Sequence, residues 1–394
     1  MDPRRNPYAP GAGTPPPDLA GRDEILERAS VALDRIRAGR AARSFIYYGL
    51  RGVGKTVLLN NIRLDAETRE IAAVWMEAPE GRSLPGVLAP ALRTALLRLN
   101  RGAAAKAAAA RAMRALAGFV KALKVKYDDI EVGVDFETEK GLADSGDLDM
   151  DLMDLLMAIG EAAKERDTAF VMFIDELQYV PEEQLAALVS ALHRVAQSQL
   201  PATMVAAGLP QLLAQMGRAK SYAERLFEFI EITPLAQQAA RDAIINPAQS
   251  ENVQYRNNAV DEIIHQTGCY PYFLQEWGKH AWDAAGKSPI TRTDVEAATV
   301  TALAELDDSF FRVRFDRLTP AEKRYLRAMA ELGSGPHRSG DIADILKKKV
   351  SEVAPVRAKL INKGMIYSPS HGDNAFTVPL FDGFMKRVMP KVER

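Results

Sequence analysis

One eight-residue segment constrains the fold of this chain more than any other. Residues 49–56 read Gly-Leu-Arg-Gly-Val-Gly-Lys-Thr, which is the spacing G-x-x-x-x-G-K-T. The segment follows a β-branched and aromatic run at 44–48 and precedes a stretch with helical apolar periodicity at 57–62. A glycine-rich loop with this spacing between a strand and a helix predicts a phosphate-binding loop in an α/β domain.

The chemistry of the loop follows from its residue types. Glycines allow the backbone to turn tightly, so that successive N–H groups point inward at the positive end of the following helix. We expect a nucleoside triphosphate there, with Lys55 on the β- and γ-phosphates and the Thr56 hydroxyl on Mg²⁺. The residues predicted to bind the nucleotide are Gly49, Gly52, Val53, Gly54, Lys55, Thr56 and Val57.

A second motif completes this site. Residues 169–174 form a continuous apolar run, which is typical of a central parallel strand, and Asp175 and Glu176 follow it directly. Open α/β sheets bind ligands beyond the carboxyl ends of their strands. We therefore expect Asp175 to hold the magnesium ion through water and Glu176 to polarise the water that attacks the γ-phosphate.

Composition narrows the class of protein. The chain has 394 residues, of which 47% are hydrophobic and 26% charged, enough for two or three domains. It has no run of eighteen apolar residues, and its N-terminus lacks the apolar core of a signal peptide, so we expect a cytoplasmic protein without membrane contact. One cysteine, Cys269, excludes an intramolecular disulfide, and the five histidines lack metal-ligand spacing.

Two segments stand out by composition. Residues 1–18 contain six prolines and are expected to form a flexible, extended arm. Residues 101–126 contain seven Lys/Arg and no Asp/Glu, whereas residues 128–154 contain eleven Asp/Glu and one Lys. The simplest interpretation is a helix at 103–123 that faces an acidic element, and a nucleic-acid-binding helix is the alternative. Alternating apolar residues predict a strand at Ile130, Val132, Val134 and Phe136.

With both nucleotide motifs in place, the chain resembles the AAA+ ATPases of the branch that contains the origin-recognition initiators and the related archaeal and STAND-type ATPases. Residues 20–24, Ala-Gly-Arg-Asp-Glu, resemble the family box beside the adenine and place Arg22 there. Residues 175–178, Asp-Glu-Leu-Gln, resemble its Walker B motif, and residues 267–271 resemble the G-x-P motif of its lid, which places Pro271 at the nucleotide. Arg225, in the segment before the lid, corresponds to an arginine finger that acts on a neighbouring subunit's γ-phosphate; a surface salt bridge with Glu224 or Glu228 is the alternative.

The chain departs from the family at two places. Where sensor 1 has a polar side chain, this chain has Ala207-Gly208-Leu209, so that Thr203 or Gln178 would have to substitute and hydrolysis is expected to be slow. Cys269 stands where the lid motif usually has glycine. Arg51, at a variable position of the phosphate loop, is expected to face solvent or a partner.

The C-terminal part predicts two further domains. Residues 234–306 have helical apolar periodicity, and their aromatic residues recur at helical spacing, so we expect a helical lid whose aromatics form its core rather than a base-stacking platform. Thr319-Pro320 is a helix start, and the pattern that follows predicts three helices and a β-hairpin, which together make a winged helix. The expected domains are the arm (1–18), an AAA+ core (19–233) with an insert at about 101–150, the lid (234–312) and the winged helix (313–394).

Charge favours DNA as a ligand of the last domain. Residues 318–394 contain 14 Lys/Arg and 8 Asp/Glu, although the whole chain has a net charge of −1. On the third helix Arg357, Lys359 and Lys363 are predicted to contact DNA. The sequence thus predicts an ATP-binding and ATP-hydrolysing switch whose nucleotide state positions a winged helix on DNA. The alternative is a STAND-like signalling ATPase whose winged helix makes protein or autoinhibitory contacts; a homo-oligomer or a protein partner is compatible with both.

Overall fold

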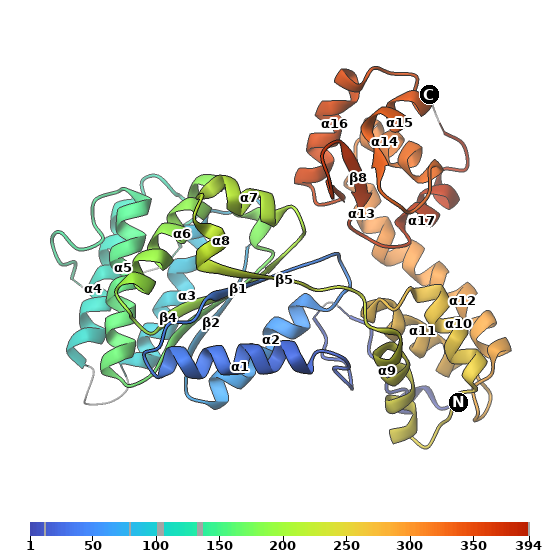
Figure 1. Cartoon of the computed structure of the whole chain (residues 1–394), viewed down its shortest axis with the longest axis horizontal. Coiled ribbons are helices and arrows are strands. Elements are labelled where there is room, and N and C mark those ends of the chain that lie inside the picture. The colour runs from blue at the N-terminus through green and yellow to red at the C-terminus, as the bar shows by residue number, and fades with distance from the viewer. Residues whose placement is uncertain (12, 79, 101–105, 132–136, 393–394) are drawn as a thin grey trace.

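The computed structural model describes residues 1–11, 13–78, 80–100, 106–131 and 137–392, which form an α/β lobe, a helical lobe and a C-terminal lobe (Figure 1). The helical lobe and the C-terminal lobe lie beyond one end of the sheet (Figure 1). Of the strand expected from Ile130, the positions 132, 134 and 136 lie outside the described residues, and Ile130 itself is buried.

Five parallel strands form the sheet of the α/β lobe in the order β2-β3-β4-β1-β5. Their bounds are β1 (Ser44–Tyr48), β2 (Ala72–Glu77), β3 (Phe170–Asp175), β4 (Ala202–Gly208) and β5 (Phe227–Glu231). All six residues of β3 are buried, and the five apolar ones alternate between two clusters: Phe170 joins one and Val171 the other. This alternation follows from the two-residue period of a strand, and it requires helices on both faces.

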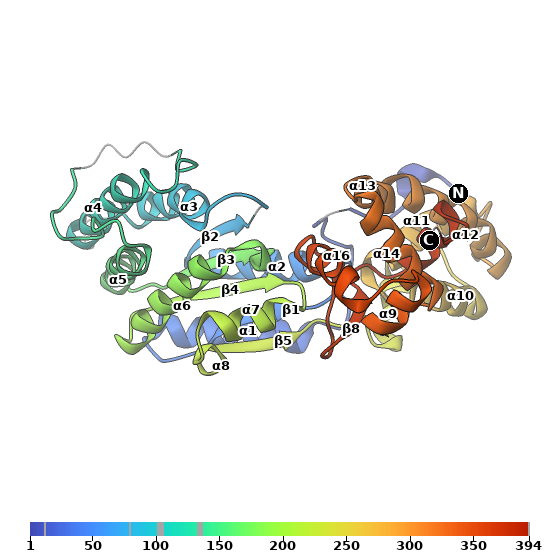
Figure 2. The same cartoon turned by 90° about the horizontal axis from the view of Figure 1, so that it is seen from above.

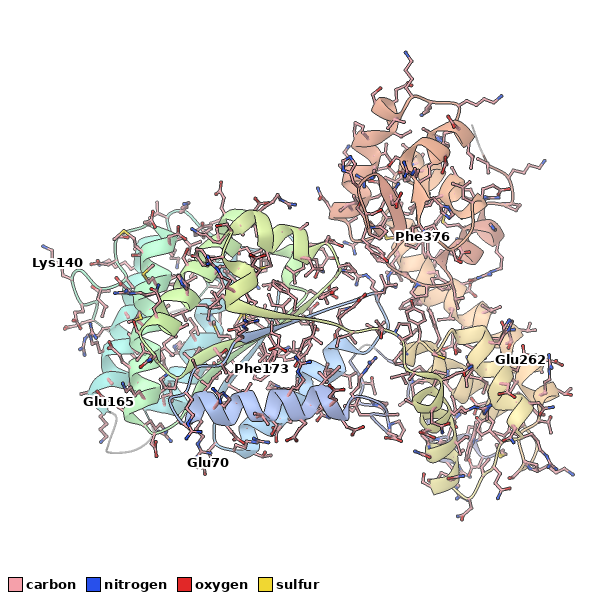
Figure 3. The ribbon with its side chains drawn as sticks, in the orientation of Figure 1. Glu70, Lys140, Glu165, Phe173, Glu262 and Phe376 are labelled. Carbon is pink, nitrogen blue, oxygen red and sulfur yellow. The ribbon has the colours of Figure 1, made fainter. Side chains whose placement is uncertain are left out.

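The helices supply those two faces (Figure 2). On one side lie α1 (Asp23–Arg37) and α2 (Lys55–Thr68). On the other lie α3 (Leu84–Leu99), α4 (Lys106–Leu123), α5 (Leu148–Glu165) and α6 (Glu182–Gln197). Figure 3 shows Phe173 between these layers. The architecture confirms the predicted α/β fold with a parallel phosphate-loop sheet.

The basic and acidic segments of the insert are paired in part by ion pairs. Helix α4 packs against α3 and α5 through an apolar face that includes Leu116 and Phe119. On its polar side Arg111 binds Glu161 at 2.6 Å and Arg114 binds Glu139 at 3.0 Å. Helix α4 therefore packs on the lobe through its apolar face and has a partly neutralised polar face.

The helical lobe contains four helices and a docked N-terminal arm. The helices are α9 (Gln237–Ser250), α10 (Asn257–Thr267), α11 (Pro271–Ala284) and α12 (Arg292–Leu306). Phe273, Trp277 and Trp282 are buried between them, as expected for core aromatics. In contrast, Tyr272 lines a cavity at the edge of the lobe.

The N-terminal arm differs from the flexible segment that its prolines predict. Tyr8 is only 4% exposed, its hydroxyl donates to the carbonyl of Ile244, and its ring lies beside Gly278, where a Cβ would approach to 2.6 Å. The indole N–H of Trp282 donates to the carbonyl of Asp2 at 3.0 Å. A proline-rich segment has no internal hydrogen bonds, so its order depends on contacts that its composition does not reveal.

A continuous helical connector joins the helical lobe, which we call the lid, to the C-terminal lobe. After α12 come a π-helical turn (Asp307–Phe311) and α13 (Arg312–Asp316). The lobe then contains α14 (Pro320–Glu331), β6 (His337–Arg338), α15 (Ser339–Ile345), α16 (Val350–Asn362), β7 (Ile366–Tyr367), β8 (Asp373–Phe376) and α17 (Phe381–Val388). The three strands pair in the order β6-β8-β7, with Phe376 facing the core (Figure 3). We call residues 313–392 the C-terminal unit.

Candidate nucleotide site

The phosphate loop has the backbone that its glycines predict. Gly52 and Gly54 have φ angles of 83° and 91°, a left-handed conformation in which other residues are strained. A Cβ on Gly49 would lie 2.2 Å from the carbonyl oxygen of Ile232, so the loop leaves no room there for a side chain. The N-terminus of α2, which begins at Lys55, points its free N–H groups into the loop and forms a site for an anion.

Lys55 is a buried cation that, among the described residues, is hydrogen-bonded to neutral carbonyl groups alone. Its Nζ donates to the carbonyls of Gly49 and Leu50, both at 2.9 Å. Burial lowers the pKa of Lys55 to about 8, against the opposing influence of Glu176 and Asp175. A phosphate group at the loop would give this ammonium the counter-ion that it lacks.

Thr56 and Asp175 come together as the two motifs predict. The Thr56 hydroxyl donates to the Asp175 carboxylate at 2.6 Å, across the gap between α2 and β3. Asp175 is 4% exposed, and burial raises its pKa. One hydroxyl and one carboxylate are hard oxygen ligands, and they fit a magnesium ion that keeps several water molecules.

Glu176 is bonded to two neighbours, one of which belongs to the phosphate loop. Its carboxylate accepts a hydrogen bond from the Gln178 side chain and lies 3.5 Å from the Arg51 guanidinium. The Gln178 side-chain oxygen accepts a bond from the N–H of Leu209 at 3.0 Å, which connects Glu176 to the end of β4. Gln178 therefore lies between Glu176 and the end of β4, which is the place expected for a residue that substitutes for sensor 1. Thr203 does not, because it bonds Ser44 at the opposite end of β4.

The expectation that Arg51 faces solvent or a partner is wrong. Its side chain is 20% exposed, and it donates to the Tyr179 hydroxyl at 2.8 Å besides pairing with Glu176. Its backbone N–H donates to the carbonyl of Thr377 at 2.9 Å, so the C-terminal unit is bonded directly to the phosphate loop. Sequence spacing cannot reveal this contact, because 326 positions separate the two residues.

A cavity of about 420 Å³ opens above the loop. Among the predicted nucleotide residues, those that line it are Arg22, Gly52, Val53, Gly54, Lys55, Thr56, Val57, Asp175, Glu176 and Pro271. Arg22 donates to the carbonyls of Val53 at 3.2 Å and Thr233 at 2.7 Å, and burial lowers its pKa. The lid closes the same cavity, because the N–H of Tyr272 donates to the carbonyl of Gly52 at 3.1 Å.

Several cavity residues have no signal in the sequence. The N-terminal arm lines the cavity through its segment from Ala9 to Pro16, leaving aside position 12, which lies outside the described residues. Glu77, Gln275, Phe310 and Arg314 also line it, from four different elements. Burial lowers the pKa of Arg314 to about 10. None of these residues belongs to a spaced motif, so only the tertiary structure brings them together.

Arg225 lies at the wrong end of the sheet to act on the nucleotide of its own chain. It is exposed in the short helix α8 (Ala223–Leu226), directly before β5. Phe227 pairs with Ser44 at the start of β1, whereas the phosphate loop follows the end of β1 at Tyr48. Four residue steps of a strand span about 13 Å, which exceeds the reach of an arginine side chain. A role for Arg225 as a finger is thus confined to a second copy of the chain.

The three predicted DNA contacts have different environments. Lys359 is exposed on α16. Arg357 instead binds the hairpin through Asn374 at 2.5 Å and Ser368 at 2.9 Å, and Lys363 binds the buried Glu322 at 2.8 Å. A cavity of about 870 Å³ separates part of α16 from the α/β lobe, and Gln211 donates across this boundary to the carbonyl of Ile361 at 3.3 Å.

Comparisons with known proteins identify one domain with a described activity. Residues 18–205 match the family model of an AAA ATPase domain, and residues 308–385 match a domain of unknown function (DUF8462). An uncharacterised HTH-type transcriptional regulator of Methanocaldococcus jannaschii is 23% identical over 231 residues, which are 57% of this chain and 56% of that protein. The chain therefore spans only about half the length of this curated relative.

A solved structure with little sequence identity shares the fold. The Walker-type ATPase of Pyrococcus abyssi superposes with a TM-score of 0.60 at 15% identity, covering 95% of this chain and 97% of the other. The Aeropyrum pernix Orc1 protein, solved in complex with DNA, has a TM-score of 0.47 at 14% identity and covers 94% of each chain. Within the described residues, no helix combines the length and apolar character needed to cross a membrane.

Proposed function

We propose that the protein is an ATP-dependent switch whose nucleotide state sets the position of the C-terminal unit, and the match of residues 18–205 to an AAA ATPase domain supports this. The observation that carries the proposal is the hydrogen bond from the Arg51 N–H to the Thr377 carbonyl. A phosphate loop that binds nucleotide changes the surroundings of its own variable residues, and Arg51 is bonded both to Glu176 and to the C-terminal unit. Nucleotide binding and docking of the unit thus involve the same residue.

The site also supports hydrolysis of ATP. Lys55 and the N–H groups of the loop would bind the phosphates, while Thr56 and Asp175 would hold Mg²⁺, which neutralises charge during phosphoryl transfer. Glu176 would orient and polarise the attacking water. In the conformation described here its carboxylate is bonded to Gln178 and paired with Arg51, so it must be released before it can face the γ-phosphate. We infer that hydrolysis is slow while the C-terminal unit is docked.

DNA is the proposed ligand of the released unit. The order of its helices and strands supports a winged helix, in which α16 would be the recognition helix. The curated relative is named as an HTH-type transcriptional regulator, which supports the same ligand. Basic residues outnumber acidic ones by 14 to 8 between positions 318 and 394.

The alternative, a STAND-like switch without nucleic acid, has its own supporting observation. Part of α16 faces the α/β lobe across the 870 Å³ cavity, and Arg357 and Lys363 are already bonded within the chain. Docking therefore covers a surface that DNA would need. In the alternative, the docked state is autoinhibited, and the C-terminal unit binds a protein after its release.

Binding to a fluorescent random-sequence duplex distinguishes the two functions. The measurement compares no nucleotide, ADP and a non-hydrolysable ATP analogue with Mg²⁺, each across a salt series, with Lys55→Ala as the nucleotide-blind control. We expect salt-sensitive binding that is strongest with the ATP analogue and lost in the variant. Absence of binding in every state would refute the DNA proposal and leave the protein-directed alternative, which predicts ADP retained through purification.

A further inference from the structure

Three side chains of the lid bring metal-binding atoms together outside the nucleotide site. Glu276 and His280 lie four positions apart on α11 and therefore share one face of this helix. Glu305 lies at the end of α12, which packs beside α11 (Figure 1). One ligand atom of each residue lies within 4.8 Å of the other two. None of the three residues lines the nucleotide cavity, so they form a separate cluster, which we call the lid cluster.

The ring of His280 is oriented by a neighbour that leaves one nitrogen free. The Thr301 hydroxyl lies 3.1 Å from Nδ1 of His280, and it donates its one proton to the carbonyl of Ala298 at 2.9 Å. Thr301 must therefore accept a hydrogen bond from Nδ1–H. In the neutral ring the lone pair is then on Nε2, which is how a second-shell partner prepares a histidine to bind a metal ion.

The groups that surround Nε2 are acceptors too. This buried atom lies 3.1 Å from Oε2 of Glu305, but the two are not aligned as a hydrogen bond. Glu276 is 5% exposed, and its buried Oε2 has no hydrogen-bond partner among the described residues. Burial raises the pKa of Glu276, against the influence of the nearby Tyr272 hydroxyl. Lone pairs that face one another away from water are costly unless a cation lies between them.

A divalent metal ion fits these atoms better than the charges already present. Lys279 reaches Glu305 through long contacts of 3.3 Å and leaves the buried atoms of His280 and Glu276 unbonded. Atoms bound to zinc in a tetrahedron, each about 2.0–2.2 Å from the ion, lie roughly 3.3–3.6 Å from one another. The 3.1 Å between His280 and Glu305 is close to this spacing. Three protein ligands with one imidazole are typical of zinc and similar transition metals, whereas Mg²⁺ and Ca²⁺ prefer oxygen alone.

We propose that Glu276, His280 and Glu305 bind a divalent transition-metal ion of the zinc type. The exposed side of Glu305 gives the ion access and leaves room for water as a further ligand. Glu305 lies in the last turn of α12, directly before the π-helical turn that begins the connector. The bound ion thus fastens the start of the connector to α11. Histidine spacing does not reveal this site, because two of its ligands are glutamates and one of these comes from another helix.

Zinc titration of the metal-free, untagged full chain tests the site. Calorimetry is run without nucleotide and in excess Mg²⁺, which occupies sites made of oxygen ligands alone. We expect one equivalent of Zn²⁺ to bind. His280→Gln and Glu305→Gln should each weaken Zn²⁺ by roughly 100-fold or more, and Thr301→Val, which removes only the partner of Nδ1, by roughly 10-fold. His265→Gln on α10 and Glu296→Gln on α12 replace exposed residues outside the lid cluster and are the matched controls.

Hydrogen–deuterium exchange of α11 and α12 measures the fastening role. Zn²⁺ is expected to slow exchange in the wild-type chain relative to EDTA, and to have no effect in Glu305→Gln, where the exposed position makes misfolding an unsuitable explanation. Equal exchange in Zn²⁺ and EDTA in the wild-type chain would remove this role.

The titration has two results that would overturn the site itself. If the wild-type chain takes up no Zn²⁺, the lid cluster is an ion-pair network around a protonated His280. If His280→Gln and Glu305→Gln bind Zn²⁺ as the wild-type chain does, or if the two controls lose it equally, the ion binds elsewhere on the surface. Neither result bears on nucleotide binding, because the lid cluster lies outside the nucleotide cavity.

Discussion

Individual side chains of the site are held in a state that nucleotide must change. Lys55 is bonded to carbonyl groups of the loop. The Thr56 hydroxyl is bonded to the Asp175 carboxylate, and Glu176 is bonded to Gln178. Each of these contacts involves a polar group that is predicted to bind phosphate, Mg²⁺ or the attacking water. The residues therefore lie beside one another as predicted but not in their reactive arrangement, as we expect of the resting form of the proposed switch.

The lowered pKa of Lys55 predicts a pH dependence of nucleotide affinity. In the free protein this pKa is about 8. Bound phosphates raise it, so binding above pH 8 must take up a proton, and the Kd for ATP is expected to rise by up to about tenfold per pH unit above that value. Lys55→Arg keeps its charge throughout this range and should bind more weakly but without this pH dependence. Equal pH profiles in the two proteins would contradict the assignment; titration calorimetry from pH 7 to 9.5 measures them.

Glu176→Gln should separate hydrolysis from binding. The amide keeps the shape of the side chain but cannot accept a proton, so hydrolysis is expected to fall by roughly 10²- to 10⁴-fold while the Kd for ATP stays within a few-fold. Phosphate release under single-turnover conditions measures the rate. Glu183→Gln, an exposed residue on α6, is the control. A variant at position 176 that hydrolyses at the wild-type rate would remove Glu176 from the mechanism.

At the scale of elements, order comes from contacts between segments that are distant in sequence. The N-terminal arm depends on the lid, and the lid depends in part on Tyr8, which is buried in its apolar cluster. The hairpin β7–β8 depends on α16, because Arg357 binds its strand and turn. A basic residue on the predicted recognition helix thus has a structural role that its charge alone does not suggest.

The arm provides a stability prediction for the lid. Tyr8→Ala removes a buried ring and is expected to reduce the local free energy of unfolding by roughly 3–5 kcal/mol. Tyr8→Phe keeps the ring and loses only the bond to Ile244, about 1 kcal/mol. Hydrogen–deuterium exchange of α9 and α11 should therefore be much faster in the first variant than in the second. Equal protection in both would mean that the arm does not stabilise the lid.

Lys359 is the most suitable position for testing DNA binding by α16, because it is the exposed residue among the three predicted contacts. Lys359→Gln should lower the salt dependence of DNA affinity, with the slope of log K against log salt reduced by about 0.9 for one lost phosphate contact. Lys386→Gln, on α17, is expected to leave the slope unchanged. An unchanged slope for Lys359→Gln would exclude this face of α16 from the DNA interface.

For the whole molecule, the decisive feature is the boundary between the C-terminal unit and the α/β lobe. Among the described residues, three hydrogen bonds cross it. They join Arg51 to Thr377, Gln211 to Ile361 and Arg317 to Glu80. The Arg317–Glu80 pair is exposed, and such pairs contribute at most about 1 kcal/mol. A boundary of a few polar contacts beside two cavities is easily opened, which is consistent with a docked state that nucleotide binding releases.

Opening of this boundary can be measured directly. In a Cys269→Ser background, which removes the one native cysteine, Ala214→Cys and Ala358→Cys place labels at exposed positions of α7 (Leu212–Ala219) and α16. Energy transfer between the labels is expected to be high without nucleotide and to fall with a non-hydrolysable ATP analogue. The same labels in a Lys55→Ala chain should not respond. A constant signal with the ATP analogue in the otherwise wild-type chain would show that nucleotide does not move the C-terminal unit.

The local patterns of the sequence determine the parallel sheet, the two nucleotide motifs and the helical lid, because strand and helix periodicity and loop spacing act within a few residues. They also predict Lys55, Thr56, Asp175 and Glu176, each of which lies at the end of a strand or at the start of a helix. The tertiary structure alone decides that the arm lines the cavity, that Arg51 turns inward and that Arg314 joins the site, because these contacts connect residues up to hundreds of positions apart. It also confines Arg225 to action on another copy, since strand register rather than sequence order decides which end of the sheet a residue occupies.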